Sequence, residues 1–203
     1  MTAVLVVLGG YLLGSMPFGY WLVLLLKHED VRKVGSGNIG ASNVWRTYGK
    51  SYVIPIVVLD VAKGFVPAFV GTILVSPLVG VLAGGAAMLG HWRPLFLRFE
   101  RGGKAVATCG GAFFGVAPLV GAVGLVVWIL VFAVCRYASV SSIAAAISLP
   151  VASVLLGEPW PVDVFACAAA AAVVVLHRTN IARLRAGTET RFRFRRPAQP
   201  VKS

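Results

Sequence analysis

The chain has 203 residues, of which 58% are hydrophobic and only 13% are charged, and its mean hydropathy is +0.85. A soluble domain carries about 25% charged residues, so this composition excludes an ordinary soluble enzyme and indicates an integral membrane protein. The formal net charge of +12 would suit a nucleic-acid-binding protein, but the positions of the cations favour another explanation. The three cysteines stand in separate apolar runs without a C-x-x-C pair, which predicts free thiols.

Apolar segments of membrane-spanning length recur along the chain. A spanning helix needs about 20 mostly apolar residues. The clear candidates are residues 3–26, 52–75, 77–92, 117–135, 138–157 and 161–177. A further segment, residues 104–116, is short and rich in glycine, and hydropathy alone leaves open whether it spans the membrane or re-enters it.

The cations favour seven spans over six. Every Lys and Arg except Lys63 lies in, or at the edge of, the connections after the first, third, fifth and seventh segments. With seven spans, the positive-inside rule places these connections and the C-terminus in the cytoplasm and the N-terminus outside. With six spans the alternation breaks at residue 104. We therefore expect an all-α integral membrane protein, a seven-transmembrane-helix bundle.

The domain organisation follows from the same pattern. We expect one membrane domain, residues 1–190, followed by a basic cytoplasmic tail, residues 191–203. An anionic inner leaflet attracts such a tail by about 1 kcal/mol per cation near its surface. No internal repeat is evident, so an inverted-repeat transporter is not favoured.

A dense polar segment, KVGSGNIGASNVWRTYGK, follows the first span at residues 33–50. Its glycines offer backbone N–H groups without a Cβ, and a helix N-terminus favours an anion. Arg46 follows one turn later, where a guanidinium can form a bidentate pair with phosphate. The plain alternative is an interhelical loop with a helix cap, which is weaker here because the segment is long and ends in Arg. Its short side-chain donors are Ser36, Asn38, Ser42 and Asn43.

Two further polar clusters fall on the same predicted face. Gly102, Gly103 and Lys104 open the fourth span in the manner of a phosphate loop, although the spacing is not that of a Walker A motif. A turn with a snorkelling lysine is the alternative. His177 and Asn180 stand three residues apart, so they share a helix face at the end of the seventh span. For these two residues the alternative is an ordinary headgroup contact.

Charged residues inside the second span form a separate feature. Asp60 and Lys63 lie at i and i+3, so they can pair with each other. Charges within a span are rare and often functional, so structural pairing and a substrate-facing role are equally open. His91 is interpreted as a structural interface residue.

The chemistry of the site is also constrained by what the sequence lacks. There is no G-x-S-x-G nucleophile, no H-x-x-x-x-D acyltransfer pair and no metal-ligand cluster. A site without a nucleophile or a strong base needs a substrate that is already activated. Glycine N–H groups, Arg and Lys then suggest that a phosphate is the leaving group or part of the substrate.

Five segments together resemble the bacterial acyl-phosphate:glycerol-3-phosphate acyltransferase family, over about residues 9–190. They are GSMPFGY, GSGNIGASN…R, DVAKG, GHWRPLFLRF…GGKAVAT and HRTNIARL…GTE. The resemblance implies a multi-pass protein of the bacterial plasma membrane with its active site facing the cytoplasm. It implies transfer of an acyl chain from acyl phosphate to the 1-hydroxyl of glycerol 3-phosphate, giving lysophosphatidic acid and phosphate, the first acylation step of phospholipid biosynthesis.

The resemblance also implies the partners. No cofactor, metal or nucleic acid takes part. The partners are the two substrates, membrane lipids and, as a further candidate, the soluble enzyme that makes acyl phosphate.

The family's site residues are carried over by position. The implied catalytic residues are Ser36, Arg46, Lys104, His177 and Asn180. The implied substrate-binding residues are Gly37, Asn38, Gly40, Ser42, Asn43, Gly102 and Gly103. The sequence departs from the family's pattern at three places: Ser42 stands where the family usually has Thr, Ala105 stands where GGKG has Gly, and one extra residue precedes the paired glycines.

Two other functions remain open on the sequence. A transporter of phosphorylated metabolites would explain the spans, the pair of Asp60 and Lys63, and the basic loops. It does not explain why all polar motifs lie on one face, because a transport path also needs polar residues at its outer end. A lipid-binding scaffold is a third interpretation. If the enzyme interpretation holds, our hypothesis is that a substrate phosphate takes the proton of the attacking hydroxyl, while His177 forms a hydrogen bond.

Overall fold

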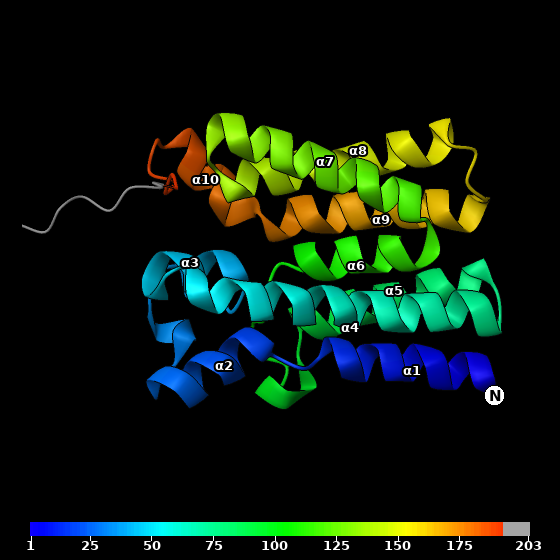
Figure 1. The fold of residues 1–203 in the computed structure, drawn as a ribbon, viewed down its shortest axis with the longest axis horizontal. Coiled ribbons are helices and arrows are strands. Elements are labelled where there is room, and N and C mark those ends of the chain that lie inside the picture. The colour runs from blue at the N-terminus through cyan, green and yellow to red at the C-terminus, as the bar shows by residue number, and fades with distance from the viewer. Residues whose placement is uncertain (193–203) are drawn as a thin grey trace, which may run out of the picture.

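The computed structural model describes residues 1–192, and all of their regular secondary structure is helical, which confirms the expected all-α class. Figure 1 shows the long helices lying side by side. The N-terminus is at one end, and α2, α3 and α10 are at the other. The helices are α1 (Thr2–Gly14), α2 (Phe18–Lys27), α3 (Ala41–Tyr48), α4 (Val53–Leu74), α5 (Pro77–Trp92), α6 (Val106–Val116), α7 (Pro118–Cys135), α8 (Ala138–Leu155), α9 (Trp160–Leu176) and α10 (Arg178–Arg185).

All seven apolar segments are helical, but they differ in length. Within residues 1–192, four stretches are long and apolar enough to cross a bilayer: Thr2–Lys27, Lys50–Leu74, Pro118–Cys135 and Ala138–Leu155. α9 and α10 form a fifth candidate span if the pair, which is bent by 55°, is taken as one. α5 has 16 residues and α6 only 11, so neither reaches spanning length by itself.

The first candidate span is broken between α1 and α2, and the charged pair of α4 lies beside the break. α1 ends at Gly14 and α2 begins after Pro17, which cannot donate a backbone hydrogen bond. Lys63 Nζ donates to the carbonyl oxygen of Met16 (2.9 Å) and lies 2.8 Å from Asp60 Oδ1. Both charged side chains are buried. The structure therefore favours the structural pairing, which satisfies a carbonyl that an unbroken helix would have bonded.

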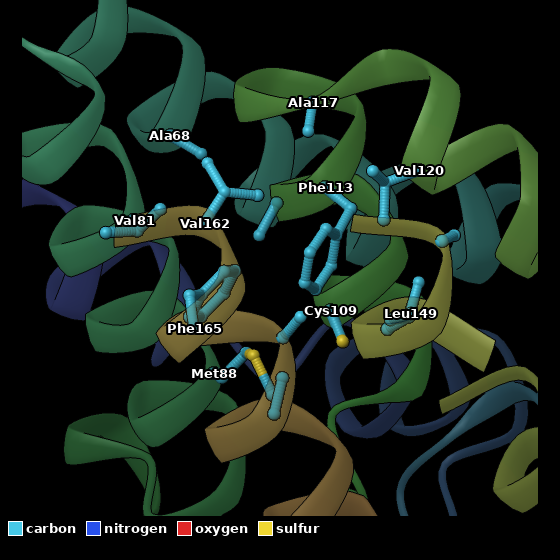
Figure 2. Close-up of a cluster of buried hydrophobic side chains, with 14 of the residues drawn as sticks. Ala68, Val81, Met88, Cys109, Phe113, Ala117, Val120, Leu149, Val162 and Phe165 are labelled. Atoms are coloured by element: carbon cyan, nitrogen blue, oxygen red, sulfur yellow. The ribbon is translucent and has the colours of Figure 1, made fainter. Parts of the chain in front are cut away.

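The apolar core lies where α4–α9 meet (Figure 2). The rings of Phe113 and Phe165 stack with their centroids 4.9 Å apart. α4 and α6 are so close that a Cβ at Gly64 or Gly111 would overlap a backbone carbonyl of the other helix. Small residues allow such close contact between membrane helices, and this contact fixes the position of the short α6.

The end of the described chain contacts the bundle. The predicted tail, residues 191–203, lies outside the described residues except for Arg191 and Phe192. The N–H of Phe192 donates to the carbonyl oxygen of Arg136 (2.9 Å), and the Phe192 side chain is buried. The packed structure thus extends two residues beyond the predicted domain boundary at residue 190.

Candidate active site

The three polar segments meet at the end of the bundle that carries α3 and α10 (Figure 1). Two adjoining pockets, of about 90 Å³ and about 360 Å³, share Ser36 and Arg183 in their walls. The smaller pocket is lined by Ser36, Asn38, Arg101, Lys104, Thr179 and Arg183. The larger is lined by Gly35, Ser36, Asn43, Arg46, Thr47, Arg183, Glu189 and Thr190.

Asn43 organises the loop that precedes α3. Its Oδ1 accepts a hydrogen bond from the N–H of Ser36 (2.8 Å). Its Nδ2 donates to the carbonyl oxygens of Asn38 (2.9 Å) and Val34 (3.1 Å). Because its amide is fully engaged within the loop, Asn43 shapes the pocket wall rather than offering a free donor. The loop in turn places Ser36 at both pockets.

The glycines of this loop have a conformational role. Gly35 and Gly37 adopt φ values of +58° and +67°, a region that other residues rarely enter. The N–H of Gly37 donates to Val34, and that of Gly40 donates to Asn38 Oδ1 (2.8 Å). These N–H groups are therefore not directed at an anion, in contrast to the cradle predicted from the sequence.

The predicted contact of Ser42 with substrate stays a prediction. Ser42 lies in the first turn of α3 and lines neither pocket.

Gly102 and Gly103 pack against α5, and their contact with substrate stays a prediction. Their N–H groups donate to the carbonyl oxygens of Trp92 (2.9 Å) and His91 (3.0 Å) at the end of α5. Both glycines are buried, and a Cβ at Gly103 would overlap the His91 ring. The pair therefore allows the loop to pack against α5, and Lys104 then reaches the smaller pocket. His91 has the structural role that the sequence suggested.

Ala105, one of the departures from the family pattern, is in the left-handed region with φ +56°. A side chain there costs roughly 1–2 kcal/mol relative to right-handed backbone, a cost that glycine avoids. The neighbouring loop residues Gly102 and Gly103 are bonded to α5, and Ala105 itself is buried.

A network of hydrogen bonds around the buried Glu189 joins the second and third polar segments. Lys104 Nζ donates to Asn180 Oδ1. Asn180 Nδ2 and Ser139 Oγ donate to Glu189 Oε1 (2.7 and 2.8 Å), and Arg183 Nε donates to Glu189 Oε2 (2.7 Å). The network brings Lys104 and Asn180 into contact, although 76 residues separate them.

The pKa values follow from burial and neighbouring charge. Burial lowers the pKa of Lys104 to about 8, and the Arg183 cation acts in the same direction. Burial alone would raise the pKa of Glu189, but hydrogen bonds from Asn180, Ser139 and Arg183 hold it below its ordinary value. Burial also lowers the pKa of Arg46, against the attraction of Glu189. Glu189 is therefore an anion at neutral pH and lies among cations.

His177 is buried between α9 and α10 and lines neither pocket. Its Nδ1 lies 2.8 Å from the carbonyl oxygen of Val173. A carbonyl can only accept, so Nδ1 carries the proton and Nε2 is left as an acceptor in the neutral ring.

The sequence reasoning did not select several residues that line or hold the pockets. Arg183 contributes to both pockets, and Arg101 and Thr179 line the smaller one. Glu189 was quoted within the third motif but was not chosen as a site residue. The available signals were the position of Arg183, three residues after Asn180 on the same helix face, and a lone carboxylate in a strongly cationic segment.

Comparisons with known proteins agree over nearly the whole chain. A model of the glycerol-3-phosphate acyltransferase family matches residues 4–187. A relative with that name from Desulforudis audaxviator is 44% identical over 195 residues, covering 96% of this chain and 98% of its own. Another, from a Roseiflexus species, is 47% identical over 197 residues, covering 95% and 96%.

Two solved structures resemble this chain over nearly its whole length. The crystal structure of PlsY, an integral membrane glycerol 3-phosphate acyltransferase, in its glycerol 3-phosphate form superposes with a TM-score of 0.90 at 40% identity. The lysophosphatidic acid form gives 0.87 at 38% identity. Each comparison covers 95% of this chain and 96% of the other. The family match, the curated relatives and the shared fold therefore show that this chain belongs to the glycerol-3-phosphate acyltransferase family and is a membrane acyltransferase.

Proposed function

We propose that the enzyme transfers an acyl chain from acyl phosphate to the 1-hydroxyl of glycerol 3-phosphate, releasing lysophosphatidic acid and inorganic phosphate. The observation that carries this proposal is the pair of adjoining pockets, one with Lys104 and the other with Arg46, which share Ser36 and Arg183. Each pocket offers cations for one phosphate, and the reaction brings together two phosphate-bearing substrates. The glycerol 3-phosphate and lysophosphatidic acid forms of PlsY support the acceptor and the product.

The transfer is direct rather than through an acyl-enzyme. Within residues 1–192, no His, Asp or Glu side chain forms a hydrogen bond with the Ser36 hydroxyl, so this residue lacks the base that an activated serine needs. The acceptor hydroxyl attacks the carbonyl carbon of acyl phosphate, and the bond from that carbon to the phosphate oxygen breaks. The cations of the pocket that holds the donor stabilise the charge that develops on its departing phosphate.

The hydroxyl proton goes to a substrate phosphate, while His177, whose ring is buried beside the pockets rather than in their walls, forms a hydrogen bond. With Nδ1 bonded to Val173, the free Nε2 can accept a hydrogen bond from the 1-hydroxyl but cannot donate one to phosphate. This refines the hydrogen-bonding role expected from the sequence.

We infer that all seven apolar segments cross the plasma membrane, with the pockets facing the cytoplasm. α6 alone is about 16 Å long at 1.5 Å per residue, well short of the ~30 Å hydrocarbon core. The loop of residues 102–105 lies at the cytoplasmic end of α6, outside the crossing, where Lys104 lines the smaller pocket. The clustering of Lys and Arg at the pocket end supports the orientation.

Labelling of single cysteines in a cysteine-free background checks this orientation. We expect a membrane-impermeant maleimide to modify Lys33→Cys and Arg185→Cys only from the cytoplasmic side and Glu158→Cys only from outside. Modification of Lys33→Cys and Glu158→Cys from the same side would contradict the seven-span arrangement.

The donor is tested with purified protein in detergent, glycerol 3-phosphate and three forms of one acyl chain: acyl phosphate, acyl-CoA and acyl carrier protein. We expect lysophosphatidic acid from acyl phosphate alone, because only that donor carries a phosphate on the reacting carbonyl. Turnover in detergent also separates an enzyme from a transporter, which requires a sealed membrane. Equal or faster product formation from acyl-CoA would reject the proposed donor.

Lys104 tests the electrostatic role of the smaller pocket. We expect Lys104→Met to lower kcat/KM by about 30-fold or more, because charge-assisted bonds to a dianion contribute about 2 kcal/mol. Since the pKa of Lys104 is lowered to about 8, wild-type kcat/KM should fall above that pH as the ammonium loses its proton. In Lys104→Arg, whatever activity remains should persist to higher pH, because arginine stays protonated.

The control for Lys104 is Arg185→Ala, which removes an exposed cation of α10 that lines neither pocket. We expect its kcat/KM to stay within about twofold of wild type. An alkaline limb that is identical in wild type and Lys104→Arg would refute the assignment.

His177 is tested by amide substitution. We expect His177→Gln to keep substantial activity, because its carbonyl oxygen can replace the Nε2 acceptor, whereas His177→Ala should be at least about tenfold slower. The measurement is kcat/KM against pH for wild type and both variants. If His177→Gln is as inactive as His177→Ala, and the wild-type acidic limb follows one group near pH 6.5, His177 is the general base and the proposed proton path is wrong.

A further inference from the structure

An aromatic cluster packs Phe192, the last described residue, against α3 and α7. The Phe192 ring centroid lies 5.0 Å from that of Trp45 and 5.3 Å from that of Phe132. Phe132 in turn stacks on Trp128 at 4.8 Å. Only 6% of the Phe192 surface is exposed. This aromatic residue is thus held in the bundle, although the sequence placed it in the basic tail.

The segment around Phe192 is anchored by one backbone hydrogen bond and by side-chain hydrogen bonds. Its N–H donates to the carbonyl oxygen of Arg136 in the short connection between α7 and α8. Arg191 Nε donates to the carbonyl oxygen of Cys135 (3.0 Å). Three residues earlier, Glu189 accepts the bond from Ser139 at the start of α8. We call residues 189–192 the C-terminal strap, since these bonds hold the segment across the ends of both helices.

The strap forms part of the larger pocket. Glu189 and Thr190 lie in its wall together with Arg46 and Thr47 of α3, which are far from them in sequence. The guanidinium carbon of Arg46 lies 5.4 Å from the Phe192 ring centroid, within the range of a cation–π interaction. Within residues 1–192, no carboxylate lies within ion-pair distance of Arg46. The Phe192 ring therefore constrains this guanidinium without neutralising its charge.

We propose that Phe192 is a positioning residue for phosphate binding, whose ring holds the Arg46 guanidinium in the orientation that faces a substrate phosphate in the larger pocket. The inference rests on the proposed function in taking that anion to be a substrate phosphate. An aromatic ring suits this task better than a carboxylate would. A carboxylate would compete with the phosphate for Arg46, whereas a ring constrains the cation and leaves its N–H groups free to donate.

The test separates the aromatic face of Phe192 from its volume. Phe192→Leu removes the ring and keeps an apolar side chain, while Phe192→Tyr and Phe192→Trp keep a ring. We expect Phe192→Leu to raise KM for one of the two phosphate-bearing substrates, and the inhibition constant of inorganic phosphate, by about five- to tenfold. Its kcat should stay within about twofold. Phe192→Tyr or Phe192→Trp should restore both constants to within about twofold of wild type.

A control variant tests general damage to the cluster. Phe132→Leu removes a neighbouring ring that packs on Phe192. We expect it to lower the melting temperature while changing KM less than Phe192→Leu does. If Phe192→Leu does not yield folded protein, Phe192→Met, which also lacks a ring, replaces it.

Several outcomes would overturn the proposal: unchanged KM in Phe192→Leu, equal defects in Phe192→Leu and both aromatic variants, or a loss of kcat and stability without a change in KM. Wild type and variants are compared with the same donor, the one that supports turnover in the donor assay. A failure of the acyl-phosphate assignment would therefore be seen separately in that assay and would leave the comparison between variants intact.

Discussion

The hydrogen-bonded carboxylate of Glu189 is the interaction on which the site depends. It joins Ser139 of α8 to Asn180 and Arg183 of α10, and through Asn180 it reaches Lys104 in front of α6. The same segment of chain continues to Phe192 and its contact with Arg46. Without this anion, cations that are partly removed from water would be brought together with no compensating charge, which is strongly unfavourable. One carboxylate thus allows a cationic site to be assembled before any substrate phosphate arrives.

The bilayer explains why the site lies at one end of the bundle. Charged groups within spans are costly, and in α4 Asp60 and Lys63 are paired with each other beside the broken first helix. The polar segments are at the ends of the helices, where a soluble substrate and one with an acyl chain can meet. In the proposed reaction the bond that breaks is already activated, so the protein needs only to bind and orient two phosphates. This accounts for a site built from cations, hydroxyls and amides rather than from a nucleophile and its base.

Much of this arrangement was predictable from local sequence. The apolar segments and the clustering of three motifs follow from hydropathy and charge distribution, and the motifs together identified the family that the comparisons confirm. The finer roles depended on contacts between distant residues. Glycines in a polar loop suggest N–H groups open to an anion, yet those of Gly102 and Gly103 are used by α5, and no local pattern specifies how closely two helices approach. Likewise, the packing of Phe192 on Arg46 joins residues with no relation in sequence, so a basic tail was the reasonable expectation.

The most direct test of the central claim is a crystal structure of this enzyme with glycerol 3-phosphate bound. If the cationic site is assembled around Glu189 as described, the phosphate will lie in the pockets that share Ser36 and Arg183. Its oxygens will be within about 3 Å of Lys104 Nζ or the Arg46 guanidinium, and the hydrogen bonds of Glu189 to Ser139, Asn180 and Arg183 will be retained. A phosphate bound elsewhere on the chain, or a site in which Glu189 has left these three partners, would contradict the account.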